Sequence, residues 1–252
     1  MTKPLASQYP APAAKEKIIV ALDVETADDA REIIAELRDT VGAFKIGSQL
    51  FTAAGPSLVR ELTEAGIKIF LDLKFHDIPN TVANAAVEAA RLGVWMLNVH
   101  TLGGSEMMKR TAEEVRGVCE KENLAKPLVI GVTILTSSND ATLAEVGINA
   151  KVEFEVERLA TLAADCGLDG VVASPHEAEA LRKAVTDPDF LIVTPGIRPR
   201  SATKDDQKRV KTVAEAIESG SDYLVIGRPV IEAADRARAV QEIIREIEAT
   251  HK

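Results

Sequence analysis

The chain has 252 residues, a length that suits a single (β/α)8 barrel, and 46% of them are hydrophobic. A formal net charge of −9 and only 4% aromatic residues argue against a general nucleic-acid or membrane surface. The two cysteines, Cys119 and Cys166, lack metal-ligand spacing, and no apolar run approaches transmembrane length. We therefore expect a cytoplasmic protein with free thiols and with no nucleic-acid or membrane partner.

Residues 1–16 are rich in Ala and Pro and predict a loose N-terminal tail rather than a signal peptide. From residue 17 to residue 252, short apolar runs alternate with amphipathic segments, and no composition shift marks a second domain. The expected strands are 18–23, 43–47, 67–74, 95–100, 128–135, 170–173, 190–194 and 223–226. The first expected helix has its N-cap at Thr26 and ends at about residue 38. The next ones are 55–65, a helix after the third strand that ends at about 92, 105–122, 153–166, a helix that starts at about 175, and 210–219. The last expected helix starts at Pro229.

This order of elements predicts the fold class. Continuously apolar strands that alternate with helices indicate a parallel sheet. Eight such units favour one α/β domain at 17–252, a single (β/α)8 TIM barrel, with a doubly wound open sheet as the competing fold.

The third expected strand carries an unusual set of charges. Side chains two apart share a face of a strand, so Asp72 and Lys74 should point the same way, into a packed interior. Burial of charge is costly, so such a cluster at a strand end is a site hypothesis. Asp77 adds a third charge before Pro79 ends regular pairing. The simpler interpretation is a structural Asp–Lys ion pair.

Other candidate residues lie in or just after the expected strands, toward the end of a barrel where active sites are assembled. They are Asp23, Lys45, His100, Thr136, Ser137, Arg198, Gly227 and Arg228. Packing of a hydrophobic core does not require so many polar residues at one end of a barrel. Their shared location is therefore stronger evidence for a functional site than any single motif.

Two of these strand ends suggest a phosphate site. Gly227 lets the backbone approach a ligand, the following helix offers free N–H groups, and Arg228 can clamp phosphate oxygens. The polar segment 198–209 is long enough for a lid, from which Arg198 or Gln207 could reach a ligand. The alternatives are an ordinary helix start with a solvated arginine and a plain surface loop.

The run over 72–81, Asp-Leu-Lys-Phe-His-Asp-Ile-Pro-Asn-Thr, resembles the signature of the orotidine 5′-phosphate decarboxylases of bacterial type. Further matching pieces fall in family order at 22–23, 44–47, 135–137, 195–198, 207 and 226–229. The resemblance implies a cofactor-free, metal-free carboxy-lyase that converts orotidine 5′-phosphate to UMP and CO2 in de novo pyrimidine biosynthesis. It also implies a cytoplasmic homodimer with shared active sites.

The resemblance assigns roles to single residues. Lys74 would protonate the C6 carbanion, Asp72 would lie beside the substrate carboxylate, and Lys45 would complete the charge array with Asp77 from the neighbouring subunit. The implied substrate-binding residues are Asp23 and Thr81 at the ribose, Thr136 and Ser137 at the pyrimidine, and Arg198, Gln207, Gly227 and Arg228 at the phosphate.

Two further hypotheses remain open at this point. A magnesium-dependent sugar-phosphate lyase or aldolase of the same barrel superfamily would need more carboxylates, and no acidic residue precedes Asp72 to complete a metal site. A non-catalytic phosphate-binding module would not need the charge array. We expect structural roles for His76 and His100, the latter as a hydrogen-bonded histidine at a strand end.

Overall fold

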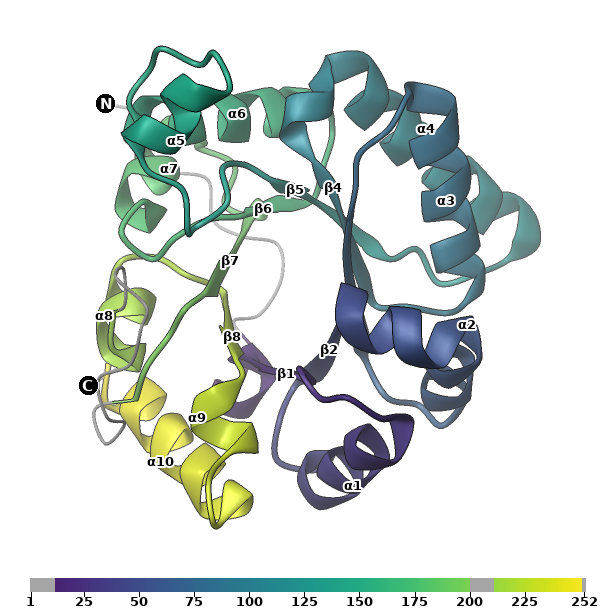
Figure 1. Ribbon diagram of the computed structural model, residues 1–252, viewed down its shortest axis with the longest axis vertical. Helices are drawn as coiled ribbons and strands as arrows, with labels where there is room; N and C mark the ends of the chain where they lie inside the picture. Colours follow the sequence, from purple (N-terminus) through teal and green to yellow (C-terminus); the bar gives the residue numbers. More distant parts are fainter. Residues whose placement is uncertain (1–11, 200–210, 251–252) are drawn as a thin grey trace.

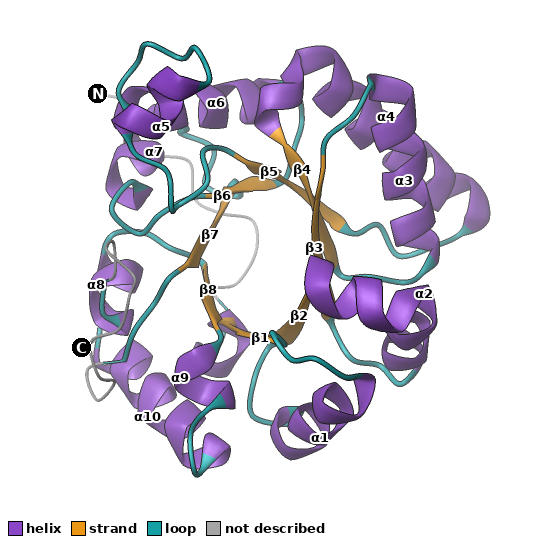
Figure 2. Ribbon diagram, in the orientation of Figure 1, coloured by secondary structure: helices purple, strands orange, loops and turns teal. Residues whose placement is uncertain are grey.

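The computed structural model describes residues 12–199 and 211–250, in which eight parallel strands close into a barrel inside a ring of helices (Figures 1 and 2). The strands are β1 (Ile18–Ala21), β2 (Ala43–Gly47), β3 (Ile69–Phe75), β4 (Met96–His100), β5 (Leu128–Val132), β6 (Gly170–Val172), β7 (Leu191–Pro195) and β8 (Tyr223–Ile226). Each strand pairs with the next along the chain, and β1 pairs with β8. The predicted barrel is confirmed, and closure between the first and last strands excludes the open sheet.

The helices lie outside the strands and cover them (Figure 2). They are α1 (Ala27–Leu37), α2 (Ser48–Glu64), α3 (Pro79–Arg91), α4 (Gly104–Glu122), α5 (Asp140–Glu145), α6 (Val152–Asp165), α7 (Ala178–Ala184), α8 (Val213–Glu218), α9 (Arg228–Ile231) and α10 (Arg236–Ala249), with 3-10 turns η1 (Ala14–Lys17) and η2 (Thr101–Gly103). Within 12–199 and 211–250, none of them combines the length and apolar character that a membrane span requires. The tail boundary at residue 16 stays a prediction, because residues 1–11 lie outside the described part.

Two layers of apolar side chains form the core. The smaller layer fills the barrel interior with Ile19, Ala21, Ala43, Phe70, Met96, Ile130, Val193 and Val225. The larger layer lies between the strands and the helices. Because side chains alternate along a strand, the next inward positions above the interior layer are polar on the first four strands: Asp23, Lys45, Asp72 and Asn98. The fold therefore places a polar layer directly above the apolar interior layer.

Most predicted elements are confirmed, and the differences have local causes. Helix α2 begins at Ser48, before the predicted start, and is broken at Gly55, whose φ of 70° permits the break. Helix α5, which was not predicted, is a six-residue segment capped by Asn139 and is too short to show a helical period. Strand β5 ends at Val132, and the last predicted helix is divided because Asp235 caps α10 separately.

The amino-terminal ends of the strands are fastened by ion pairs. Asp169, just before β6, accepts hydrogen bonds from Lys126 Nζ at 2.8 Å and from the Val129 backbone N–H at 2.7 Å. Asp222, just before β8, pairs with Arg182 and accepts from the Ile192 N–H at 2.7 Å. In this architecture residues at that end of the barrel contribute to stability and not to the active site. Substitutions in these ion pairs can therefore serve as controls for substitutions in the polar layer at the other end.

Candidate active site

A lysine flanked by two carboxylates lies at the centre of the polar layer. Lys45 Nζ is 3.1 Å from Asp23 Oδ1 and 3.5 Å from Asp72 Oδ2. The side chains of Lys45 and Asp72 are 10% and 13% exposed, whereas that of Asp23 is 56% exposed. The low exposure of the first pair keeps its interaction from being screened by solvent.

Lys74 reaches the same carboxylate from an irregular strand. Its Nζ lies 2.6 Å from Asp72 Oδ1, which confirms that Asp72 and Lys74 converge. The expected regular pleat is wrong, however, because Lys74 has a φ of 52°, in the left-handed region. Pairing with β4 runs from Leu71–Leu97 to Phe75–Val99, so four steps on β3 span two steps on β4. A bulge therefore positions the lysine.

Asn98 of β4 joins this network, and the sequence-based prediction missed it. Its side chain is fully buried. The amide Nδ2 donates to Asp72 Oδ1 at 2.6 Å, and the amide Oδ1 accepts from the backbone N–H of Lys74 at 2.8 Å. The available signal was a single amide in an otherwise apolar run, Met-Leu-Asn-Val, two residues before His100.

His100 differs from its predicted state as a hydrogen-bonded histidine. Its Nδ1 is buried and has no hydrogen-bond partner among the described residues. Its ring centroid lies 5.3 Å from that of His76. Burial lowers the pKa of His100, the neighbouring His76 and Lys74 lower it further, and Asp72 opposes them. A neutral imidazole next to the charge cluster follows from this environment.

Asp77 and Thr81 lie outside this charge network. Both are exposed, and Asp77 Oδ1 accepts a hydrogen bond from the Ile78 N–H at 2.6 Å. Asp77 makes no ion pair with any residue in the described ranges. Ile78 beside it is 66% exposed, an unusual position for a large apolar side chain.

Three of the predicted phosphate residues, Arg198, Gly227 and Arg228, lie at the same end of the barrel. A side chain at Gly227 would begin 3.4 Å from Asp23 Oδ2, so this backbone lines the polar layer. Arg198 is fixed through its backbone N–H, which donates to Lys211 O at 3.2 Å. Helix α9, which follows Gly227, has only four residues, so its dipole is weak.

The remaining predicted residues are placed as follows. Thr136 and Ser137 form a turn after β5, which is closed by a hydrogen bond from the Ser138 N–H to Leu135 O at 2.8 Å. Gln207 lies outside the described residues, as does most of the predicted lid.

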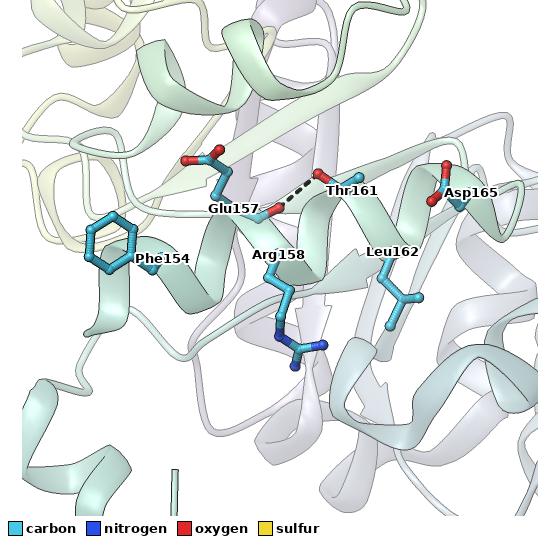
Figure 3. Close-up of a pocket in the computed structure, with 6 residues that line it drawn as sticks. All are labelled: Phe154, Glu157, Arg158, Thr161, Leu162 and Asp165. Atoms are coloured by element: carbon cyan, nitrogen blue, oxygen red, sulfur yellow. Dashed lines mark hydrogen bonds between the residues drawn. The ribbon is translucent and has the colours of Figure 1, made fainter. Parts of the chain in front are cut away.

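A pocket on the outer side of α6 is a separate feature (Figure 3). Its lining includes Phe154, Arg158 and Leu162, and Thr161 Oγ1 donates to the Glu157 carbonyl there at 3.0 Å. Because these residues lie on the helix face opposite to the buried Val156, Leu159 and Ala163, the pocket is remote from the polar layer.

The composition of the polar layer bears on metal binding. No group of three or more His, Cys, Asp or Glu side chains in the described part of the chain could hold a metal ion. The carboxylates Asp23 and Asp72 are instead bridged by Lys45.

A closed parallel barrel with a lysine–carboxylate network at the carboxyl ends of its strands defines a barrel of the enzymatic type. Residues 16–243 match the family described as Orotidine 5′-phosphate decarboxylase / HUMPS, and the chain belongs to this family.

Three proteins illustrate the similarity. A Geobacter sulfurreducens protein named orotidine 5′-phosphate decarboxylase is 55% identical over 236 residues, covering 94% of this chain and 98% of that protein. A Syntrophotalea carbinolica protein of the same name is 54% identical over 94% of this chain and 96% of its own length. The crystal structure of orotidine 5′-phosphate decarboxylase from Lactobacillus acidophilus is 38% identical, with a TM-score of 0.80, and covers 91% of this chain and 98% of that one.

Proposed function

We propose that this protein is a cytoplasmic carboxy-lyase that converts orotidine 5′-phosphate to UMP and CO2 in pyrimidine biosynthesis. The observation that carries the proposal is the Lys45–Asp72–Lys74 network at the barrel mouth. More than half identity to proteins named for this activity, over nearly full length, supports the same substrate.

The reaction needs a cation at one carbon atom. When the bond from C6 to the carboxylate breaks, CO2 leaves and the electron pair stays on C6. The pyrimidine ring delocalises this pair poorly, so the protein has to stabilise a localised negative charge. The Lys74 ammonium supplies positive charge at that position and transfers a proton to C6, and solvent then reprotonates the amine.

Asp72 and Lys45 prepare Lys74 for this step. Asp72 Oδ1 lies 2.6 Å from Lys74 Nζ, which fixes the ammonium group before substrate arrives. Lys45 balances the second oxygen of the same carboxylate. In our proposal the substrate carboxylate lies beside the Asp72 carboxylate. When the substrate carboxylate departs as neutral CO2, Asp72 remains as the one anion of that pair.

The rest of the substrate would be held by the predicted binding residues. We assign the ribose to Asp23 and the pyrimidine edge to Thr136 and Ser137. The phosphate would bind at Gly227 with Arg228, Arg198 and Gln207. Binding energy from the phosphate would then serve to orient C6 against Lys74.

We also propose a homodimer in which Asp77 and Thr81 complete the site of the partner subunit. The exposed apolar side chains Ile78 and Leu102, in the loops after β3 and β4, support a protein contact there. Mixing the inactive variants Lys74→Ala and Asp77→Asn under exchange conditions should restore activity, because one site of each hybrid keeps both groups. Mixtures that stay inactive despite exchange would contradict shared sites.

The direct test follows the loss of orotidine 5′-phosphate absorbance with purified, chelator-treated protein. We expect full turnover, and we expect Lys74→Ala to abolish it while UMP still binds by calorimetry. Lys183→Ala removes an exposed lysine that pairs with Glu179 on α7, and it should leave turnover unchanged. Activity that requires added magnesium would favour the sugar-phosphate lyase instead.

A further inference from the structure

Asn98 is the one amide in direct contact with both Asp72 and Lys74 among the described residues. It lies on β4, its side chain is wholly buried, and it takes no direct part in the proposed reaction. A buried amide is retained at low cost only when its donor and its acceptor are both satisfied. Here both partners belong to the charge network.

The contact with Lys74 is made to its backbone. The N–H of Lys74 donates to Asn98 Oδ1 at 2.8 Å, at the residue whose φ is 52°. A left-handed lysine persists only where the surroundings hold it. The bulge breaks the ladder between Leu71 and Phe75, and the Asn98 carbonyl gives the Lys74 N–H an acceptor within that break.

The contact with Asp72 is made to the oxygen that Lys74 also uses. Asn98 Nδ2 lies 2.6 Å from Asp72 Oδ1, and Lys74 Nζ lies 2.6 Å from the same atom. The amide thus fixes the rotation of the carboxylate, and the carboxylate fixes the ammonium group. The orientation of the Asn98 amide is set by these partners, since one is a donor and the other an acceptor.

We propose that Asn98 is a positioning residue that holds the catalytic lysine in register with its carboxylate by clamping both the Lys74 backbone and Asp72. The inference rests on the proposed decarboxylase function. Asn98 contacts no reacting atom in this scheme. It acts through the two groups that do, and a shift of about 1 Å in such groups lowers rates about 100-fold.

The first test is Asn98→Leu, which keeps the branching and the number of side-chain heavy atoms and removes both hydrogen bonds. We expect kcat to fall about 100-fold while KM and UMP affinity stay close to wild type. The matched control is Thr194→Val on β7, which removes a buried hydroxyl that donates to the Tyr223 carbonyl at 3.3 Å, away from the network. This control should lose some stability and keep its kcat.

The second test, Asn98→Asp, keeps the acceptor for Lys74 and replaces the amide donor with a carboxyl group facing Asp72. Its turnover relative to wild type should be low near neutral pH and should rise in acid, where a protonated carboxyl donates again. The ionisable groups around this position are Asp72 and Lys74 on β3, Lys45 on β2, and His100 with His76 beside it. These groups are present in wild type as well, so the ratio of the two turnover rates isolates the introduced carboxyl.

The third measurement does not depend on activity. Hydrogen exchange at the Lys74 amide should accelerate in Asn98→Leu and stay slow in Asn98→Asp and in Thr194→Val. If wild type turns over and Asn98→Leu keeps its kcat, or if Asn98→Asp shows no recovery in acid, the positioning role is wrong. If Asn98→Leu does not fold, the acid profile of Asn98→Asp decides. A wild type without decarboxylase activity overturns the proposed function instead, and the exchange result still tests the clamp.

Discussion

Replacing Lys45 by methionine tests whether the buried lysine acts on the substrate or only stabilises the barrel. The change removes the ammonium group and keeps most of the stem, so packing against the interior layer is largely preserved. Asp72, whose side chain is 13% exposed, then keeps Lys74 and Asn98 but loses the cation beside its other oxygen.

The magnitude follows from the distance. At 3.5 Å and an effective dielectric constant of about 20, the Lys45–Asp72 attraction is about 5 kcal/mol. Release of the lysine from its desolvated position offsets part of this, so we expect unfolding free energy to fall by about 3 kcal/mol. Asp23 is more than half exposed, and its pairing adds little. Loss of a charge directed at the reacting centre should lower kcat/KM by about 100-fold or more.

Urea denaturation and steady-state decarboxylation on the same preparations measure the two effects. Lys126→Met is the matched control, because Lys126 pairs with Asp169 at 2.8 Å at the opposite end of the barrel. It should cost about 1 kcal/mol and leave kcat/KM unchanged. If Lys45→Met lost stability but kept full kcat/KM, the electrostatic role of Lys45 in the reaction would be refuted.

Three further outcomes are expected. Thr26→Ala should lower stability by about 1 kcal/mol in denaturant titrations without changing turnover, because the Thr26 hydroxyl accepts from the Asp29 N–H at 3.1 Å and caps α1. Because the pKa of His100 is depressed below its ordinary 6.5, the unfolded chain binds more protons, so stability should fall as pH drops from 6.5 toward the folded pKa, and less steeply in His100→Gln. Gly227→Val should raise KM, since its side chain would start 3.4 Å from Asp23 Oδ2, and unchanged KM would place the substrate elsewhere.

The alternation of apolar runs was enough to predict the barrel, because a parallel strand covered by helices has to be apolar on both faces. The bounds predicted for β2 and β8 match the structure. Helix α5 and the first part of α2 were missed because short capped turns carry little periodic signal. The clustering of Asp23, Lys45 and Asp72 was predictable too, because each occupies the next inward-facing position after the apolar interior layer.

The geometry of Lys74 could not be read from the sequence, for a physical reason. Alternation predicts that Asp72 and Lys74 share a face, and the two side chains do meet. They meet through a bulge that depends on which residue of β4 stands opposite, and a strand does not encode its partner's register. Asn98 belongs to that partner strand. It was overlooked because its role exists only once two distant segments are paired.

The two halves of the site therefore differ in how strongly the strand pattern specifies them. Lys45 and Asp72 occupy inward positions in the regular pairing of β2 with β3, so any sequence that closes this barrel with the same parity brings them together. Lys74 is held in a conformation that a regular strand would not adopt, and its backbone N–H donates to a side chain on the next strand. The group that we propose to move the proton thus depends on tertiary pairing, whereas the groups that set the field around it follow from local pattern.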